Sequence, residues 1–166
     1  ANVQGNYFSL VSGTLATGVF TAGTIVASTV DAGTTSFTAW STNLQVNTRV
    51  LKMNSLALNF IGSAPVDALE KVKLFIDGVD SGVTGVASTI QGSNYVTFNF
   101  TAAPVTLTTG SHTLDVRVDV VKGSNRTVQF KLSNAADLSV TDAQFGMNVT
   151  ATGVSSANTT AIQFTI

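Results

Sequence analysis

Residues 111–121, Ser-His-Thr-Leu-Asp-Val-Arg-Val-Asp-Val-Val, carry the clearest structural signal in the chain. Apolar and charged residues alternate here, the apolar set being Leu114, Val116, Val118 and Val120 and the charged set Asp115, Arg117 and Asp119. This period of two places the two sets on opposite faces, as in a β-strand with one buried and one wet face. The β-branched valines also disfavour a helix. We therefore expect a strand at the centre of an antiparallel sandwich.

Short β-prone runs separated by turn signals continue on both sides of this strand. Residues 71–77 alternate in the same way and end at Asp77-Gly78, a pair typical of tight turns. Residues 44–60 also alternate but change phase at Val50-Leu51, as a β-bulge or a corner between two sheets would require. One helical turn is expected, over residues 66–70. This pattern predicts an all-β, antiparallel β-sandwich.

The inward positions of these strands form the expected core. The set is Leu56, Leu58, Phe60, Val72, Leu74, Ile76, Val96, Phe98, Phe100, Leu114, Val116, Val118, Val128, Phe130 and Leu132.

Length and composition limit the classes of protein to consider. The 166 residues suit a single domain, 1–166, and only 10% of them are charged. The net charge of −1 argues against a nucleic-acid partner, because phosphate binding needs clustered Lys and Arg. No apolar run is long enough for a membrane span, and the absence of cysteine excludes disulfides and thiolate metal sites. A first residue other than methionine is what removal of a secretion signal or preparation of an engineered fragment would leave.

Charge is unevenly distributed along the chain. Residues 1–48 contain Asp31 as their single charged residue, and residues 143–166 contain none. A soluble monomer usually spreads charge over its whole surface. Two interpretations are open: these ends are covered by other subunits in an assembly, or they are ordinary strands whose surface is wetted by hydroxyl groups.

Two motifs resemble a known class of module. Residues 71–78, Lys-Val-Lys-Leu-Phe-Ile-Asp-Gly, resemble a "Leu-Tyr-Val-Asp-Gly" hairpin, and residues 105–121 contain Thr109-Gly110-Ser111-His112-Thr113-Leu114, similar to a "Thr-Gly-x-His-x-Leu" strand start. Both occur in immunoglobulin-like modules of large prokaryotic surface proteins. The resemblance covers about residues 49–142 and implies an immunoglobulin-like β-sandwich. It leaves the function open, since such modules serve as spacers, adhesins and filament subunits.

The ionisable residues do not form a recognisable reaction centre. His112 is the only histidine and no Gly-x-Ser-x-Gly motif occurs, so a Ser-His-Asp triad is not expected. Glu70 is the only glutamate, and Asp115 and Asp119 share an outer face with Arg117, as in a solvated charge ladder. We expect no enzyme, no catalytic residue and no cofactor.

Paired aspartates are the weak candidates for a metal. Asp77 and Asp80 flank Gly78, and Asp137 and Asp142 bracket a short strand. Carboxylate and backbone oxygens in such loops can hold Ca²⁺, although the spacing differs from the EF-hand loop. Ordinary turn chemistry is the alternative for all four residues.

Two further features bear on binding and modification. The aromatic residues Tyr7, Trp40, Phe75, Tyr95 and Phe145 could form a sugar platform or could fill a core or an interface. The acceptor pattern Asn-x-Ser/Thr occurs at Asn99, Asn125, Asn148 and Asn158. Asn125 is best placed for a glycan because it lies in a polar turn.

Together these features predict a secreted, extracellular structural subunit of a cell-surface filament, pilus-like, or of a surface array. Residues 1–30 would donate a strand to the next copy of a homopolymer, with residues 31–166 as the sandwich body. The inserted side chains would be Tyr7, Phe8, Leu10 and Val11, or Leu15, Val19 and Phe20. The alternative is a non-catalytic adhesin or carbohydrate-binding module of a larger surface protein. An exposed Trp40 would favour this alternative.

Overall fold

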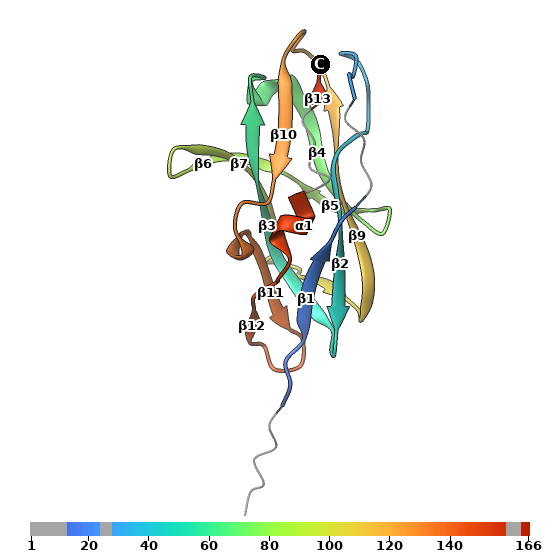
Figure 1. The fold of residues 1–166 in the computed structure, drawn as a ribbon, viewed down its shortest axis with the longest axis vertical. Helices are drawn as coiled ribbons and strands as arrows, with labels where there is room; N and C mark the ends of the chain where they lie inside the picture. Colours follow the sequence, from blue (N-terminus) through green and yellow to red (C-terminus); the bar gives the residue numbers. More distant parts are fainter. Residues whose placement is uncertain (1–12, 24–27, 159–163) are drawn as a thin grey trace, which may run out of the picture.

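The computed structural model describes residues 13–23, 28–158 and 164–166. They form two antiparallel β-sheets packed against each other, which confirms the all-β sandwich. The molecule is elongated along its strands, and the C-terminus lies at its upper end (Figure 1).

The first sheet has five strands in the order β1-β2-β9-β4-β5. Their bounds are Thr17–Thr21 (β1), Phe37–Asn47 (β2), Gly110–Val120 (β9), Leu69–Ile76 (β4) and Val79–Thr84 (β5). The strand expected from residues 111–121 is β9, and it lies in the middle of the sheet between β2 and β4. Its four alternating apolar side chains are fully buried, as the period of two predicts.

The second sheet is built on the long strand β3, Leu51–Gly62. The other strands of this sheet are β6 (Val86–Ile90), β7 (Ser93–Asn99), β8 (Val105–Leu107), β10 (Thr127–Lys131), β11 (Leu138–Asp142), β12 (Asn148–Val149) and β13 (Phe164–Thr165). One edge of β3 pairs with β11 and β10, and the other edge pairs with β8 and β7. Four strands, β7, β8, β10 and β11, therefore pair directly with β3.

The two sheets are joined at a corner between β2 and β3. β2 ends at Asn47 in the first sheet and β3 begins at Leu51 in the second. The phase change at Val50-Leu51 therefore marks a corner, not a β-bulge. Thr48 turns the chain with φ 72, in the left-handed region that a β-branched residue rarely adopts.

The expected core is confirmed with two exceptions. All its members are buried except Val72 and Ile76, whose side chains are half-buried. Within it the rings of Phe60 and Phe130 meet edge to face, with their centroids 5.5 Å apart. The core also takes in large residues that were not expected there, namely Phe20, Trp40, Leu44, Met53 and Leu107.

The uncharged ends supply part of this core. β1 and β2 are ordinary strands of the first sheet, and Ala151, Ala157 and Ile166 are buried. For the described part of both ends, the ordinary-strand interpretation accounts for the missing charge. Residues 1–12 lie outside the described residues, so both interpretations remain open for them.

Helical structure is short. The turn expected over residues 66–70 is the 3₁₀ helix η1, Val66–Ala68, while η2, Ala135–Asp137, and the helix α1, Val154–Asn158, were not expected. The C-terminal part of the described chain contributes two short strands, β12 and β13. Among the described residues no helix combines the length and apolarity needed to cross a bilayer.

Candidate functional site

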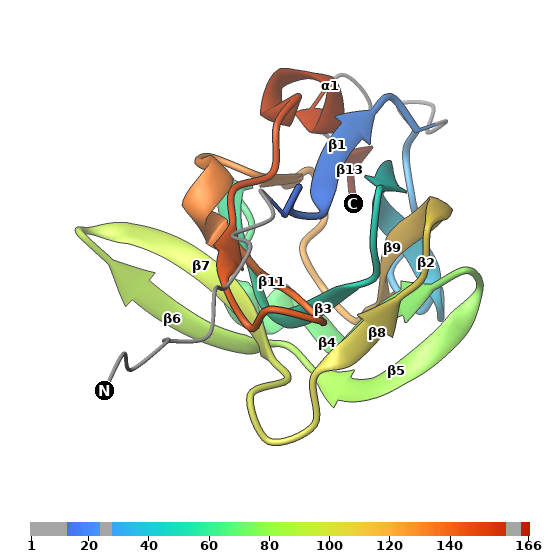
Figure 2. The same ribbon diagram turned by 90° about the horizontal axis from the view of Figure 1, so that it is seen from below.

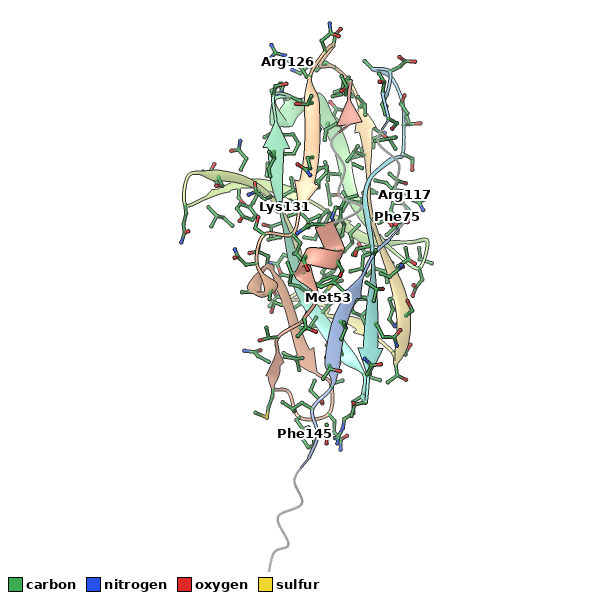
Figure 3. All side chains as sticks on the ribbon, in the orientation of Figure 1. Met53, Phe75, Arg117, Arg126, Lys131 and Phe145 are labelled. Carbon is green, nitrogen blue, oxygen red and sulfur yellow. The ribbon has the colours of Figure 1, made fainter. Side chains whose placement is uncertain are left out.

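The lower end of the molecule carries an exposed apolar cluster, which we define as Gly13, Leu15, Phe145 and Met147. Phe145 is labelled at this end in Figure 3, opposite Arg126 at the upper end. Phe145 and Met147 are 44% and 56% exposed, and the four residues line a hollow of about 320 Å³. The guanidinium of Arg49 lies 4.6 Å from the centroid of the Phe145 ring. The N-terminal segment thus joins the body beside an apolar surface.

Asp142 fastens this part of the chain to the body. Its buried carboxylate accepts hydrogen bonds from the backbone amides of Ala16 at 2.8 Å, Gln144 at 2.8 Å and Phe145 at 3.0 Å. The bond from Ala16 is the largest cause that holds the pKa of Asp142 below its ordinary value, and burial opposes it. Asp142 thereby joins the start of the body to the 142–147 turn.

The expected inter-subunit residues fall into two groups. Tyr7, Phe8, Leu10 and Val11 lie outside the described residues. Leu15 and Val19 are half-buried and Phe20 is buried, because β1 pairs with β2 of its own subunit. In this arrangement Phe20 fills its own core, so the structure favours the first group as the inserted side chains.

Asp77 and His112, which belong to the two motifs of the sequence resemblance, are in direct contact. The Asp77 carboxylate lies 2.7 Å from Nδ1 of His112, and it accepts a hydrogen bond from the Thr113 amide at 2.9 Å. The other ring nitrogen, Nε2, lies 2.7 Å from the carbonyl oxygen of Thr108. The carboxylate partner of His112 lies 35 residues away in the sequence, and its carbonyl partner lies four residues away. The pair ties the β4–β5 turn to the start of β9.

Both ring nitrogens of His112 face acceptors, so only the protonated ring satisfies both. Burial lowers the pKa of His112, but the bonds to Asp77 and Thr108 outweigh it, so the pKa lies above its ordinary value of about 6.5. Burial also raises the pKa of Asp77, but its bonds to His112 and Thr113 bring it below its ordinary value. The interaction is therefore complete at pH values above the pKa of Asp77 and below that of His112.

This geometry predicts a loss of stability on the alkaline side. A raised folded-state pKa means that the stabilisation by His112 is fully present below the unfolded pKa and is lost as pH rises through the folded pKa. We expect the free energy of unfolding to fall by about 1 kcal/mol, roughly one hydrogen bond, between pH 5.5 and 8.5. Urea unfolding at the two pH values measures this. His112→Gln should remove most of the difference, and an equal drop in this variant would assign the pH dependence to other groups.

The calcium candidates have other partners in the fold. Asp80 accepts hydrogen bonds from Nζ of Lys73 at 2.6 Å and from the Gly82 amide at 2.9 Å. Asp137 accepts a hydrogen bond from the Asn134 amide at 2.9 Å. No group of three or more His, Asp or Glu side chains that could hold a metal occurs in the described part of the chain. The turn chemistry of all four aspartates is explained without a metal.

A charged hollow lies on the outer face of β4 and β9. It has a volume of about 410 Å³, and its lining includes Lys71, Lys73, Asp80, Arg117 and Asp119. Arg117 stacks on Phe75, its guanidinium carbon 4.2 Å from the ring centroid, and Figure 3 labels both side chains on the same flank. Lys71 pairs with Asp119 at 3.0 Å and Lys73 with Asp80 at 2.6 Å. Arg117 pairs with Asp115 at 3.5 Å, outside the lining, so each of the three cations of the hollow already has a carboxylate partner.

The aromatic residues do not gather into a platform in the described structure. Trp40 is fully buried and Tyr95 is 8% exposed. Phe75 lies under Arg117, and Phe145 belongs to the lower apolar cluster. Among the described candidates Phe145 is thus the exposed one, and Tyr7 lies outside the described residues, so the sugar-binding alternative stays a prediction.

Three of the four glycan acceptor sites are exposed. Asn125 lies in the turn before β10, where its amide donates to the carbonyl oxygen of Ile166 at 2.7 Å, and its side chain is exposed. Asn99, at the end of β7, accepts hydrogen bonds from the amide and the hydroxyl of Thr101. Asn148 is an exposed residue of β12.

Asn158 is different, because its side chain is hydrogen-bonded to the backbone of Leu132. Its Oδ1 accepts from the Leu132 amide at 2.9 Å, and its Nδ2 donates to the Leu132 carbonyl oxygen at 2.7 Å. A glycan on Nδ2 would displace the second bond. This role of Asn158 could not be read from the sequence, where it stands in an uncharged stretch without periodicity.

Comparison of the chain with protein-family models and with curated proteins finds no match. The resemblance to immunoglobulin-like surface modules therefore stays a prediction, and function has to be inferred from geometry and composition.

Proposed function

We propose that the protein is a structural subunit that polymerises into an extracellular filament, pilus-like, or a surface array by β-strand addition. Residues 1–12 of one copy would pair with a sheet edge of the next copy. β1 and Val30 lie in the sandwich, so the donor is shorter than the expected residues 1–30. The body then begins at Gly13 rather than at Asp31.

The observation that carries this proposal is the apolar cluster at the lower end. The uncharged N-terminal segment leaves the body there, beside exposed Phe145 and Met147, and the C-terminus lies at the opposite end (Figures 1 and 3). Exposed apolar groups gathered around a chain terminus favour contact with another molecule. A contact between unlike surfaces that does not close into a ring generates a filament.

The composition of the segment supports the same function. Residues 1–12, Ala-Asn-Val-Gln-Gly-Asn-Tyr-Phe-Ser-Leu-Val-Ser, contain no charge and no proline. As a strand they would present Phe8 and Leu10 on one face and Tyr7 and Val11 on the other. Strand addition gains its affinity from backbone hydrogen bonds and its specificity from alternate side chains. Neither needs charge.

Deletion of residues 1–12 tests the proposal. We expect the untagged full chain to form long uniform fibres in negative-stain microscopy and light scattering, and the deleted protein to stay monomeric. The deletion ends before Ala16 and Phe20, so the unfolding midpoint of the monomer should stay close to that of the full chain.

A matched control keeps the length of the segment. Replacing residues 1–12 with a Gly/Ser sequence of equal length should also abolish the fibres, because the apolar side chains are lost. Fibres that persist in both variants, or a full chain that remains monomeric under all conditions, would rule out residues 1–12 as a polymerising strand.

A further inference from the structure

One sheet edge differs from the others in the described structure. Residues 79–90 run continuously from β5 in the first sheet to β6 in the second. β5 is the last strand of its sheet, and among the described strands β6 pairs only with β7. Gly85 marks the crossing, where a Cβ would lie 2.5 Å from Cγ1 of Val96. The chain thus forms one edge that spans both sheets.

The other described edges are covered or short. β1 is bonded on its outer side by Thr152, through Phe20 N to Thr152 O at 2.8 Å and Thr152 N to Gly18 O at 2.9 Å. β13 is bridged by Thr29, and β12 has only two residues. Of the described strands, β5 and β6 therefore combine length with an open side, and of these two β6 contains no charged residue.

The open strand is apolar and lacks the usual protection. All five residues of β6 are exposed, Val86 being 66% and Ile90 44% exposed, and Val79 in β5 is 69% exposed. Soluble proteins guard such edges with lysine, proline or bulges. Residues 81–94 contain no charged residue and no proline. The β6–β7 hairpin also stands away from the body (Figures 1 and 2), so a second backbone can approach it.

The N-terminal segment matches this edge in charge and length. Residues 1–12 and β6 are both free of charged residues, so pairing them leaves no ion without a partner. Twelve extended residues span about 40 Å and five about 17 Å. The segment is thus long enough to pair along all of β6 and still leave a linker to Gly13.

On these grounds we propose that β6, with the adjoining end of β5, is the edge that receives residues 1–12 of a second copy of this chain. The proposal rests on the proposed function and names its acceptor. The added strand would extend the second sheet beyond β6.

The hairpin geometry shows which amides would take part. Gln91 and Gly92 both have positive φ, 49 and 80, as in a two-residue type I′ turn. The closing pair Ile90–Ser93 then exchanges hydrogen bonds, and the pairs alternate along the ladder. By this alternation the amides of Ala87 and Thr89 point away from β7, toward an added strand.

Ala87→Pro removes one outward amide and spares the hydrogen bonds to β7, since proline is accepted on the open side of an edge strand. We expect at least roughly tenfold weaker polymerisation, through the lost bond and the bulk of the ring, with an unchanged unfolding midpoint of the monomer. Ala87→Ser keeps the amide and should polymerise like the unmodified chain.

Cysteine cross-linking identifies the contact directly, because the chain has no cysteine. Protein carrying Ser9→Cys is mixed with protein carrying Ala87→Cys, Ser88→Cys or Thr89→Cys, polymerised and oxidised. At least one mixture should yield the disulfide-linked heterodimer, which requires Cα atoms within about 7 Å. Ser124→Cys, at an exposed turn far along the chain from β6, is the control and should give none.

The outcomes separate the two proposals. Fibres that need residues 1–12 but give no cross-link to β6 and tolerate Ala87→Pro would overturn the acceptor and leave the filament function intact. Fibres that survive deletion of residues 1–12, or a full chain that never polymerises, would overturn both. Cross-links together with sensitivity to Ala87→Pro would establish the acceptor edge.

Discussion

Phe20→Ala is expected to lower the free energy of unfolding by about 3–5 kcal/mol, the usual cost of deleting a buried phenylalanine side chain. Phe20 is 1% exposed in β1, whose five residues pair with β2. Its loss leaves a cavity under the first sheet and weakens the attachment of β1. Urea unfolding of the monomeric protein lacking residues 1–12 measures the effect free of polymerisation.

Val19→Ala is the matched control, because Val19 is on the same strand but half-buried and faces the other side. Its cost should stay near 1 kcal/mol. The comparison also tests whether the expected donor group of Leu15, Val19 and Phe20 inserts into a neighbouring copy or belongs to its own subunit. Stability is compared in the protein lacking residues 1–12, and polymerisation in the full chain. If Phe20→Ala left the stability unchanged but stopped the full chain from polymerising, Phe20 would insert into a neighbouring copy, contrary to its place in the described core.

Asn158→Ala is expected to cost about 2–4 kcal/mol, because it leaves both the amide and the carbonyl group of Leu132 without their partner. The Leu132 side chain is fully buried, so water has little access to replace the lost bonds. Thermal and urea unfolding of the two proteins measure the difference.

Asn148→Ala removes the same side chain from an exposed position in β12 and should change stability by less than about 0.5 kcal/mol. Equal effects of the two substitutions would show that the contact between Asn158 and Leu132 contributes nothing. A glycosylating host adds a second comparison: Asn125 should be modified far more often than Asn158.

The regular strands could be predicted because their periodicity agrees with their final environment. In β9 every second residue is apolar, and one face is buried and the other wet. The phase change at Val50-Leu51 was visible in the sequence, but it fitted a β-bulge as well as a corner, and only the structure shows that the chain changes sheet there. The alternation of apolar and polar residues is enough to predict a strand wherever one face of that strand is buried and the other is not.

Charge distribution misled the prediction for the N-terminal region. Residues 1–30 were expected to donate a strand to a neighbouring copy, but within them Phe20 and Val30 are core residues. Absence of charge has two causes, burial in the chain's own core and burial against another chain, and sequence alone does not separate them. Only the strand pairing of β1 with β2 decides between them.

Contacts between distant residues could not be predicted. Three side chains form such contacts. The Asp142 carboxylate accepts a hydrogen bond from the Ala16 amide, and the Asp77 carboxylate is hydrogen-bonded to the His112 ring. The Asn158 side chain accepts a hydrogen bond from the Leu132 amide. Each joins a polar side chain to a group far away in sequence, and local periodicity carries no information about such pairs. Asp77 and Asp142 were named as calcium candidates from their spacing alone, which does not show that their carboxylates accept hydrogen bonds from Thr113 and Ala16.

The position of β3 has a consequence for the order of events during synthesis. β3 ends at Gly62, but its partners begin with β7 at Ser93 and end with β11 at Asp142. Such non-local pairing is slow and must wait until most of the chain has left the ribosome. Residues 1–12 are made before β3 and before all of the partners of β3. β3 therefore stays without its full set of partners until residues up to Asp142 have been made, and the second sheet can close only late in synthesis.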